Sequence, residues 1–96
     1  MTATQTVVVR ISGRVSRDDV PRLCEELGAE LLRAGATEAI CEVGGLAPAD
    51  LTAVDALARM RLTARRLGCG IRLRDASPEL LALLDLIGLT GLADPG

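Results

Sequence analysis

The sequence contains no histidine and no aromatic residue, and these absences exclude several kinds of site. Without histidine, the chain lacks the commonest general base, the commonest zinc ligand and every Ser–His or Cys–His nucleophile pair. Without aromatic rings, it has no platform on which single-stranded nucleic-acid bases stack. The net charge of −2 gives no basic surface for a nucleic acid or an anionic membrane. We therefore expect no enzyme activity, no metal, no cofactor and no nucleic-acid partner.

The sequence also lacks a disulfide pattern and a long apolar run. Cys24, Cys41 and Cys69 are odd in number and have no Cys-x-x-Cys spacing, which predicts free thiols in a reducing compartment. No apolar stretch approaches the roughly 18 residues that a membrane span needs. We therefore expect a cytoplasmic protein without a membrane-spanning helix. Its 96 residues, 49% of them hydrophobic, are typical of a single domain over 1–96 with a buried core.

Hydrophobic periodicity predicts three strands alternating with three helices. The β-branched or alternating segments, which predict strands, are 6–11, 38–43 and 69–74. The segments in which apolar residues recur every three or four positions, which predict helices, are 18–34, 51–67 and 77–87. Asp18 or Asp19 is expected to cap the first helix, and Gly35 to end it. Strands that alternate with helices imply an α/β fold with a mostly parallel sheet and right-handed crossovers.

The segment 44–50 is predicted to be a loop between the second strand and the second helix. Ligands of open α/β sheets usually bind at this place, at the carboxyl ends of the strands. The segment has neither a Gly-x-Gly-x-x-Gly pattern nor a Walker Lys-Ser/Thr pair, so phosphate binding is poorly supported. Asp50 is expected to be the N-cap of the second helix, and a polar contact with a partner is the alternative.

A second apolar stripe runs along the second helix beside its core stripe. Its members are Leu51, Val54, Ala58 and Leu62. Two interpretations remain open: a small sheet could wrap the helix broadly and bury Val54, or the stripe could contact a partner. Leu51 is the harder residue to bury, because it directly follows the cap in a turn that usually prefers small polar or acidic residues. The last helix has a similar excess of leucine, which either a partner or the tail 89–92 would have to cover.

Three segments, in this order, resemble those of the STAS family, the sulfate transporter and anti-sigma factor antagonist domains. Residues 11–15, Ile-Ser-Gly-Arg-Val, resemble a strand followed by the family's Leu-x-Gly-x-Leu-Asp turn. Residues 42–50 are similar to its Asp-Leu-Ser-Gly-Val-x-x-x-Asp segment, and residues 77–92 to its closing helix and Gly-Leu ending. The resemblance implies one STAS-like domain with three to four helices. Its sheet would have four strands, or three if the family's first, antiparallel strand before Thr6 is shortened or missing.

The resemblance also implies a site at the start of the second helix. In the bacterial anti-sigma factor antagonists, this Asp is followed by two hydroxyl residues and Gly, and an anti-sigma kinase phosphorylates the first hydroxyl. Here the run is Asp50-Leu51-Thr52-Ala53, so the phosphoacceptor position holds Leu51 and only Thr52 remains as a neighbouring candidate. Asp55 stands where the family often has a small residue. We expect a surface that binds its partner without a phosphorylation switch.

The function implied is that of a protein-binding module. Its partner would be an anti-sigma factor of the kinase-like class, whose sequestration frees a sigma factor for transcription. The alternative is a scaffold or accessory subunit, in a STAS assembly or homodimer, or on a transporter ATPase. The expected partner-binding residues are Gly44, Gly45, Asp50, Leu51, Thr52, Val54, Asp55, Ala58 and Leu62.

Overall fold

Three strands and three helices alternate along the computed structural model, which describes residues 5–89. The elements are β1 (Thr6–Gly13), α1 (Asp19–Ala34), β2 (Glu38–Leu46), α2 (Leu51–Arg66), β3 (Gly70–Arg74) and α3 (Pro78–Leu86). Each element predicted from periodicity is present. The sheet of the described residues has three strands, the smaller of the two numbers that the resemblance had left open. The family's first strand and the Gly-Leu ending would fall in 1–4 and 91–92, outside the described residues.

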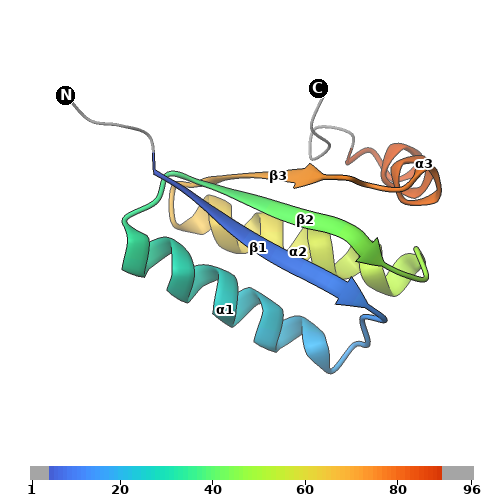
Figure 1. Cartoon of the computed structure of the whole chain (residues 1–96), viewed down its shortest axis with the longest axis horizontal. Helices are drawn as coiled ribbons and strands as arrows, with labels where there is room; N and C mark the ends of the chain where they lie inside the picture. The colour runs from blue at the N-terminus through green and yellow to red at the C-terminus, as the bar shows by residue number, and fades with distance from the viewer. Residues whose placement is uncertain (1–4, 90–96) are drawn as a thin grey trace.

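The sheet is parallel throughout its described part, in the order β1-β2-β3. Thr6 is paired with Glu38, and Glu38 in turn with Gly70. Each crossover steps one strand along the sheet, so two crossovers of the same hand place both connecting helices on one face. Figure 1 shows α1 and α2 side by side there, and the two helices pack on each other. Because both helices run back from the carboxyl ends of the strands, their N-termini lie at the same end of the molecule.

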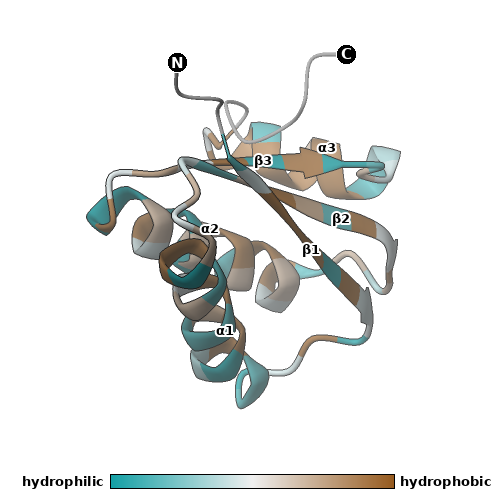
Figure 2. Ribbon diagram, turned by 60° about the vertical axis from the view of Figure 1, so that its left-hand side comes forward, coloured by the Kyte–Doolittle hydropathy of each residue, from teal (hydrophilic) through white to brown (hydrophobic). Residues whose placement is uncertain are grey.

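The core fills the space between this sheet face and the two helices. Its most completely buried side chains include Leu27 of α1, Cys41 of β2, Met60 of α2 and Leu73 of β3. Figure 2 shows hydrophilic and hydrophobic bands alternating along α1, as expected for a helix that buries one face. No buried polar or charged residue is present among the described residues, so the core is held by apolar packing.

The start of α1 differs from the expected cap. Asp18 precedes the helix, but its side chain makes no capping hydrogen bond. Instead, Ser16 N–H donates to Asp19 Oδ2 at 3.0 Å, and Ser16 Oγ donates to the same oxygen at 3.0 Å. These bonds, the backbone one first, lower the pKa of Asp19. The pattern Ser16-x-x-Asp19 is half of a capping box, in which an acidic side chain reaches back to the residue that opens the turn.

The predicted loop 44–50 is shorter than expected, because β2 continues to Leu46. The pairing between β1 and β2 shifts by one residue after Arg10, and Gly45 becomes the partner of Ser12. A Cβ on Gly44 would lie 3.2 Å from Asp75 Cβ, and one on Gly45 would lie 3.1 Å from Ser12 Cβ. The two glycines therefore allow neighbouring segments of the chain to pack closely against β2, Ser12 at Gly45 and Asp75 at Gly44. A Gly-Gly pair in the sequence does not distinguish this arrangement from a turn.

Candidate functional site

The N-terminus of α2 is fixed by Asp50, as predicted. This residue is extended, with φ −122° and ψ −179°, and its Oδ1 accepts a hydrogen bond from Ala53 N–H at 2.9 Å. The bond satisfies one of the four backbone donors that a helix start leaves unpaired. It also sets the direction in which the first turn presents its side chains. Asp50 is therefore the positioning residue of the site.

Leu51 follows the cap and projects from the first turn with 67% of its surface exposed. Asp55, Ala58 and Leu62 continue its line at spacings of three or four residues. Leu62 is 48% exposed and Ala58 is half-buried, so an apolar line broken by one carboxylate faces outward. We call these four residues the α2 stripe.

Val54 does not belong to this surface. It is 2% exposed and lies within the main hydrophobic cluster, so the first of the two interpretations of the sequence applies to it. Val54 lies about 60° around the helix from Leu51, on the side that the rest of the fold covers. It is therefore removed from the candidate contact residues, whereas Leu51 stays.

A groove of about 500 Å³ lies between the first turns of α1 and α2. Its lining residues are Arg17, Val20, Pro21, Leu51, Thr52, Asp55 and Arg59. We call it the α1–α2 groove. It joins the α2 stripe along Leu51 and Asp55, and Arg59 Nε donates to Asp55 Oδ2 at 2.9 Å across one helical turn. Thr52 is half-buried in the groove wall.

Apart from Asp50 and Val54, the predicted residues divide into three groups. Leu51, Thr52 and Asp55 are brought together at the groove, and Ala58 and Leu62 extend from it along α2. Gly44 and Gly45 are exposed at the end of β2 but do not line the groove. They lie against other parts of the fold, and their role in the described residues is to permit that packing.

Sequence reasoning missed the α1 side of the groove, which consists of Arg17, Val20 and Pro21, together with Arg59 of α2. The order of strands and helices in the sequence could have predicted this side of the groove. Right-handed crossovers in a parallel sheet with this strand order place the N-termini of α1 and α2 next to each other. Residues at the first turn of α1 could therefore have been added to those of α2.

Residues 5–89 hold no cluster of three metal-ligating side chains. Burial raises the pKa of the Cys41 thiol to about 12, so this thiol stays protonated and is a poor nucleophile. No helix within 5–89 combines the length and apolar character needed to cross a bilayer.

Comparison with known proteins identifies the family. A family model described as "Mlab, STAS domain" matches residues 2–94, nearly the whole chain. The chain belongs to the STAS domain family, as the three motifs had indicated. No curated protein matches it at a significant level.

Two solved structures confirm that the fold is like that of an anti-sigma factor antagonist. The unphosphorylated form of the anti-sigma factor antagonist SpoIIAA aligns with a TM-score of 0.73 at 22% identity, covering 98% of this chain and 82% of SpoIIAA. The phosphorylated form of SpoIIAA, described as a Bacillus cell fate determinant, aligns with a TM-score of 0.70 at 18% identity, covering 98% of this chain and 85% of the other.

Proposed function

We propose that this chain is a non-catalytic, cytoplasmic binding module whose 96 residues act as one domain. It docks the α1–α2 groove and the α2 stripe on a protein partner, an anti-sigma factor of the kinase-like class. Sequestering that partner releases a sigma factor and so regulates transcription. Membership of the STAS family and the likeness in fold to SpoIIAA support this choice of partner.

The observation that carries the proposal is the exposure of Leu51. A leucine that is 67% exposed in the first turn of a well-capped helix contributes little to folding where it stands. It borders a groove to which Pro21 adds exposed apolar surface, whereas Val20 is 6% exposed and belongs to the core. An exposed apolar residue beside a concave, partly apolar surface is the arrangement of an interface anchor.

The same residue determines how the module is regulated. SpoIIAA has been solved in a phosphorylated form, so that relative carries a phosphoryl group. At the position that the resemblance assigns to the phosphoacceptor, this chain has Leu51, which offers no oxygen. The proposed module therefore binds its partner without a phosphorylation switch. Thr52 is the neighbouring hydroxyl, but it is half-buried in the groove wall.

A second candidate function is supported by α3. Leu80 and Leu84 of this helix are buried, while Leu81 and Leu86, and Ile87 directly after the helix, are 40%, 79% and 46% exposed. Exposed apolar residues around a helix can contact a further subunit. The alternative is thus a scaffold or accessory subunit, either in a STAS assembly or homodimer or on a transporter ATPase.

Copurification distinguishes the two functions. The tagged chain is coexpressed with each kinase-like anti-sigma factor of its organism and, separately, with each transporter ATPase subunit. Leu51→Asp tests the groove, and Leu86→Asp tests α3. Leu32→Asp serves as the matched control, since Leu32 is 69% exposed on the C-terminal half of α1. We expect an anti-sigma factor to copurify with the wild type and with L32D and L86D, but not with L51D. An ATPase or STAS chain lost only with L86D would establish the alternative.

A further inference from the structure

The α1–α2 groove carries a positive charge that the described residues do not neutralise. Two arginines and one aspartate line it, which leaves one net positive charge. Arg59 is paired with Asp55 at 2.9 Å. No carboxylate within residues 5–89 forms an ion pair with Arg17. The groove is therefore locally cationic in a chain whose net charge is −2.

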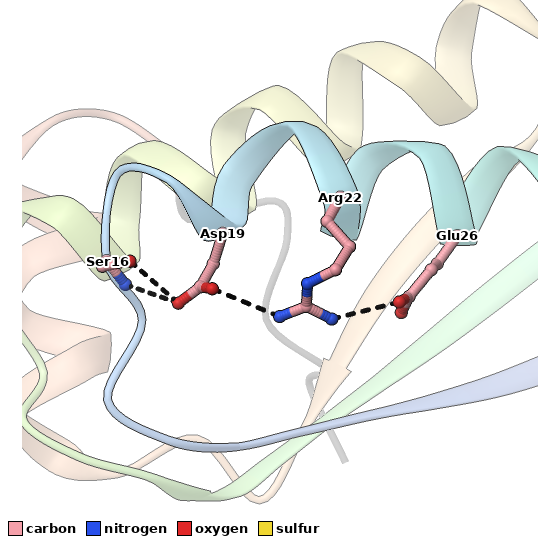
Figure 3. A network of polar contacts seen from close by, with 4 residues as sticks. All are labelled: Ser16, Asp19, Arg22 and Glu26. Carbon is pink, nitrogen blue, oxygen red and sulfur yellow. Dashed lines mark hydrogen bonds and ion pairs between the residues drawn. The ribbon is translucent and has the colours of Figure 1, made fainter.

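The other side of α1 has the opposite charge. A second groove of about 520 Å³ runs along it, lined by Asp18, Pro21, Arg22, Glu25, Glu26 and Ala29. Its one arginine, Arg22, bonds Asp19 at 3.3 Å and Glu26 at 3.0 Å, and Figure 3 shows these side chains in a row along the helix. The first turn of α1 thus separates a cationic groove from an acidic flank. Of the three arginines that line the two grooves, Arg17 is the one that forms no ion pair within residues 5–89.

The surroundings of Arg17 favour a carboxylate from outside the chain. Pro21 and Leu51 form exposed apolar walls of the same groove. An ion pair that closes against apolar surface is less screened by water than one at an open surface. The first turns of α1 and α2 both lie here, but each helix start already has a carboxylate of its own, Asp19 at α1 and Asp50 at α2. The charge that attracts an acidic side chain and repels a basic one in the groove is therefore that of Arg17.

We propose that the α1–α2 groove binds a partner segment in which an apolar side chain stands next to an Asp or Glu, and that Arg17 pairs with that carboxylate. This inference rests on the proposed function and adds the chemistry of the partner. The apolar side chain packs against Leu51 and Pro21, while the carboxylate sets the register of the segment. Charge complementarity of this kind selects one partner among surfaces of similar apolar area.

A library of random twelve-residue peptides displayed on phage tests the proposal, because such a selection does not require the partner to be identified first. The folded wild-type chain is the bait, and enriched peptides are synthesised and titrated against it. We expect enrichment of Asp or Glu beside Leu, Ile or Val. Arg17→Glu should weaken the affinity for these peptides by about 5- to 30-fold, since a carboxylate at position 17 repels the acidic residue that Arg17 attracts. Arg17→Gln should give a smaller loss, and the wild-type affinity should fall as salt rises.

Arg14→Glu is the matched control for Arg17→Glu. Arg14 lies in the same connection between β1 and α1, is exposed and does not line the groove, so the control changes net charge equally. Circular dichroism melts establish that all variants are folded. Equal binding by R17E and wild type, or enrichment of basic peptides or of none, would overturn the inference. If Leu51→Asp abolishes peptide binding while Arg17→Glu does not, the groove is the binding site but the proposed ion pair between Arg17 and an acidic residue of the partner is wrong. The proposed function is tested separately by the copurification experiment, and it fails if no anti-sigma factor copurifies with the wild-type chain.

Discussion

Leu51→Asp is the change that best separates binding from folding. If Leu51 is an interface anchor, a carboxylate at this position removes the apolar contact with the partner and competes with the partner's own carboxylate for Arg17, which lines the same groove. Partner binding should then be lost. If Leu51 instead supported the core, the same change would unfold the domain. The two interpretations give opposite results for stability.

The expected effect on stability follows from the exposure of Leu51. Because 67% of the side chain is exposed, only about a third of the ~1.5–3 kcal/mol available from full burial of leucine, about 0.5–1 kcal/mol, is at risk. The new carboxylate lies in the first turn of α2, where its interaction with the helix dipole stabilises the folded state by about 0.3–1 kcal/mol. The two contributions nearly cancel, so Tm should stay within about 4 °C of wild type.

Two reference variants set the scale for this measurement. Leu32→Asp changes an equally exposed leucine, but in the last turns of α1, where the dipole opposes an acid, so it should be somewhat less stable than L51D. Leu57→Ala removes a side chain that is 1% exposed and should cost about 2–5 kcal/mol. The expected order of Tm is wild type and L51D, then L32D, then L57A far below.

The assay pairs a melt with a binding measurement. Because the chain has no aromatic residue, unfolding is followed by far-ultraviolet circular dichroism rather than by fluorescence. Binding is measured by calorimetry with the anti-sigma factor recovered in the copurification. A fall in Tm for L51D comparable to that of L57A would refute the interface assignment. Unchanged stability with retained binding would show that Leu51 is neither anchor nor core.

Three further outcomes are expected. Incubation with candidate anti-sigma kinases and labelled ATP should leave the chain unlabelled, because Leu51 has no hydroxyl; stoichiometric label on Thr52 would contradict this. Asp50→Ala should lower stability by about 1 kcal/mol, because Ala53 N–H loses its acceptor, and a melt with unchanged Tm would count against the cap. Burial raises the Cys41 pKa from 9.0 to about 12, so the unfolded thiol ionises first as pH rises and stability is lost from pH 9 upward, by up to about 1.4 kcal/mol per pH unit. Urea titrations from about pH 8 to about pH 10.5, a window that spans the onset of this ionisation, should show the decline, and the Cys41→Ala variant should lack Cys41's part of it.

The sequence predicts the fold well because every element carries its own local signal. The helix of α2, for example, has a capping Asp50 before it and Gly68 after it, at φ +74°. Parallel order follows from alternation of strands and helices alone. The resemblance to the STAS family had left open a fourth strand before Thr6, and residues 1–4 lie outside the described part.

The candidate site is predicted only in part because its geometry depends on two helices. Spacing along α2 finds Leu51, Ala58 and Leu62, since exposed residues of one helix share a periodicity. Spacing cannot tell that Val54 is covered, because burial depends on what packs against that side of the helix. Nor can it bring Arg17 to Leu51, since 34 positions separate them in the chain and only the crossover geometry joins them.

Under the proposed function, a leucine at position 51 has a thermodynamic consequence for regulation. A phosphate adds nearly two negative charges, which at a helix N-terminus inside an apolar interface can switch binding off by desolvation and repulsion. Leu51 can carry no such charge, so the affinity of the α1–α2 groove has no covalent switch at that position. The partner's occupancy is then set by mass action, through the concentrations of the two proteins and their Kd. Under the proposed function, a cell would control this module by how much of it is made, and the partner would be bound whenever the module is in excess.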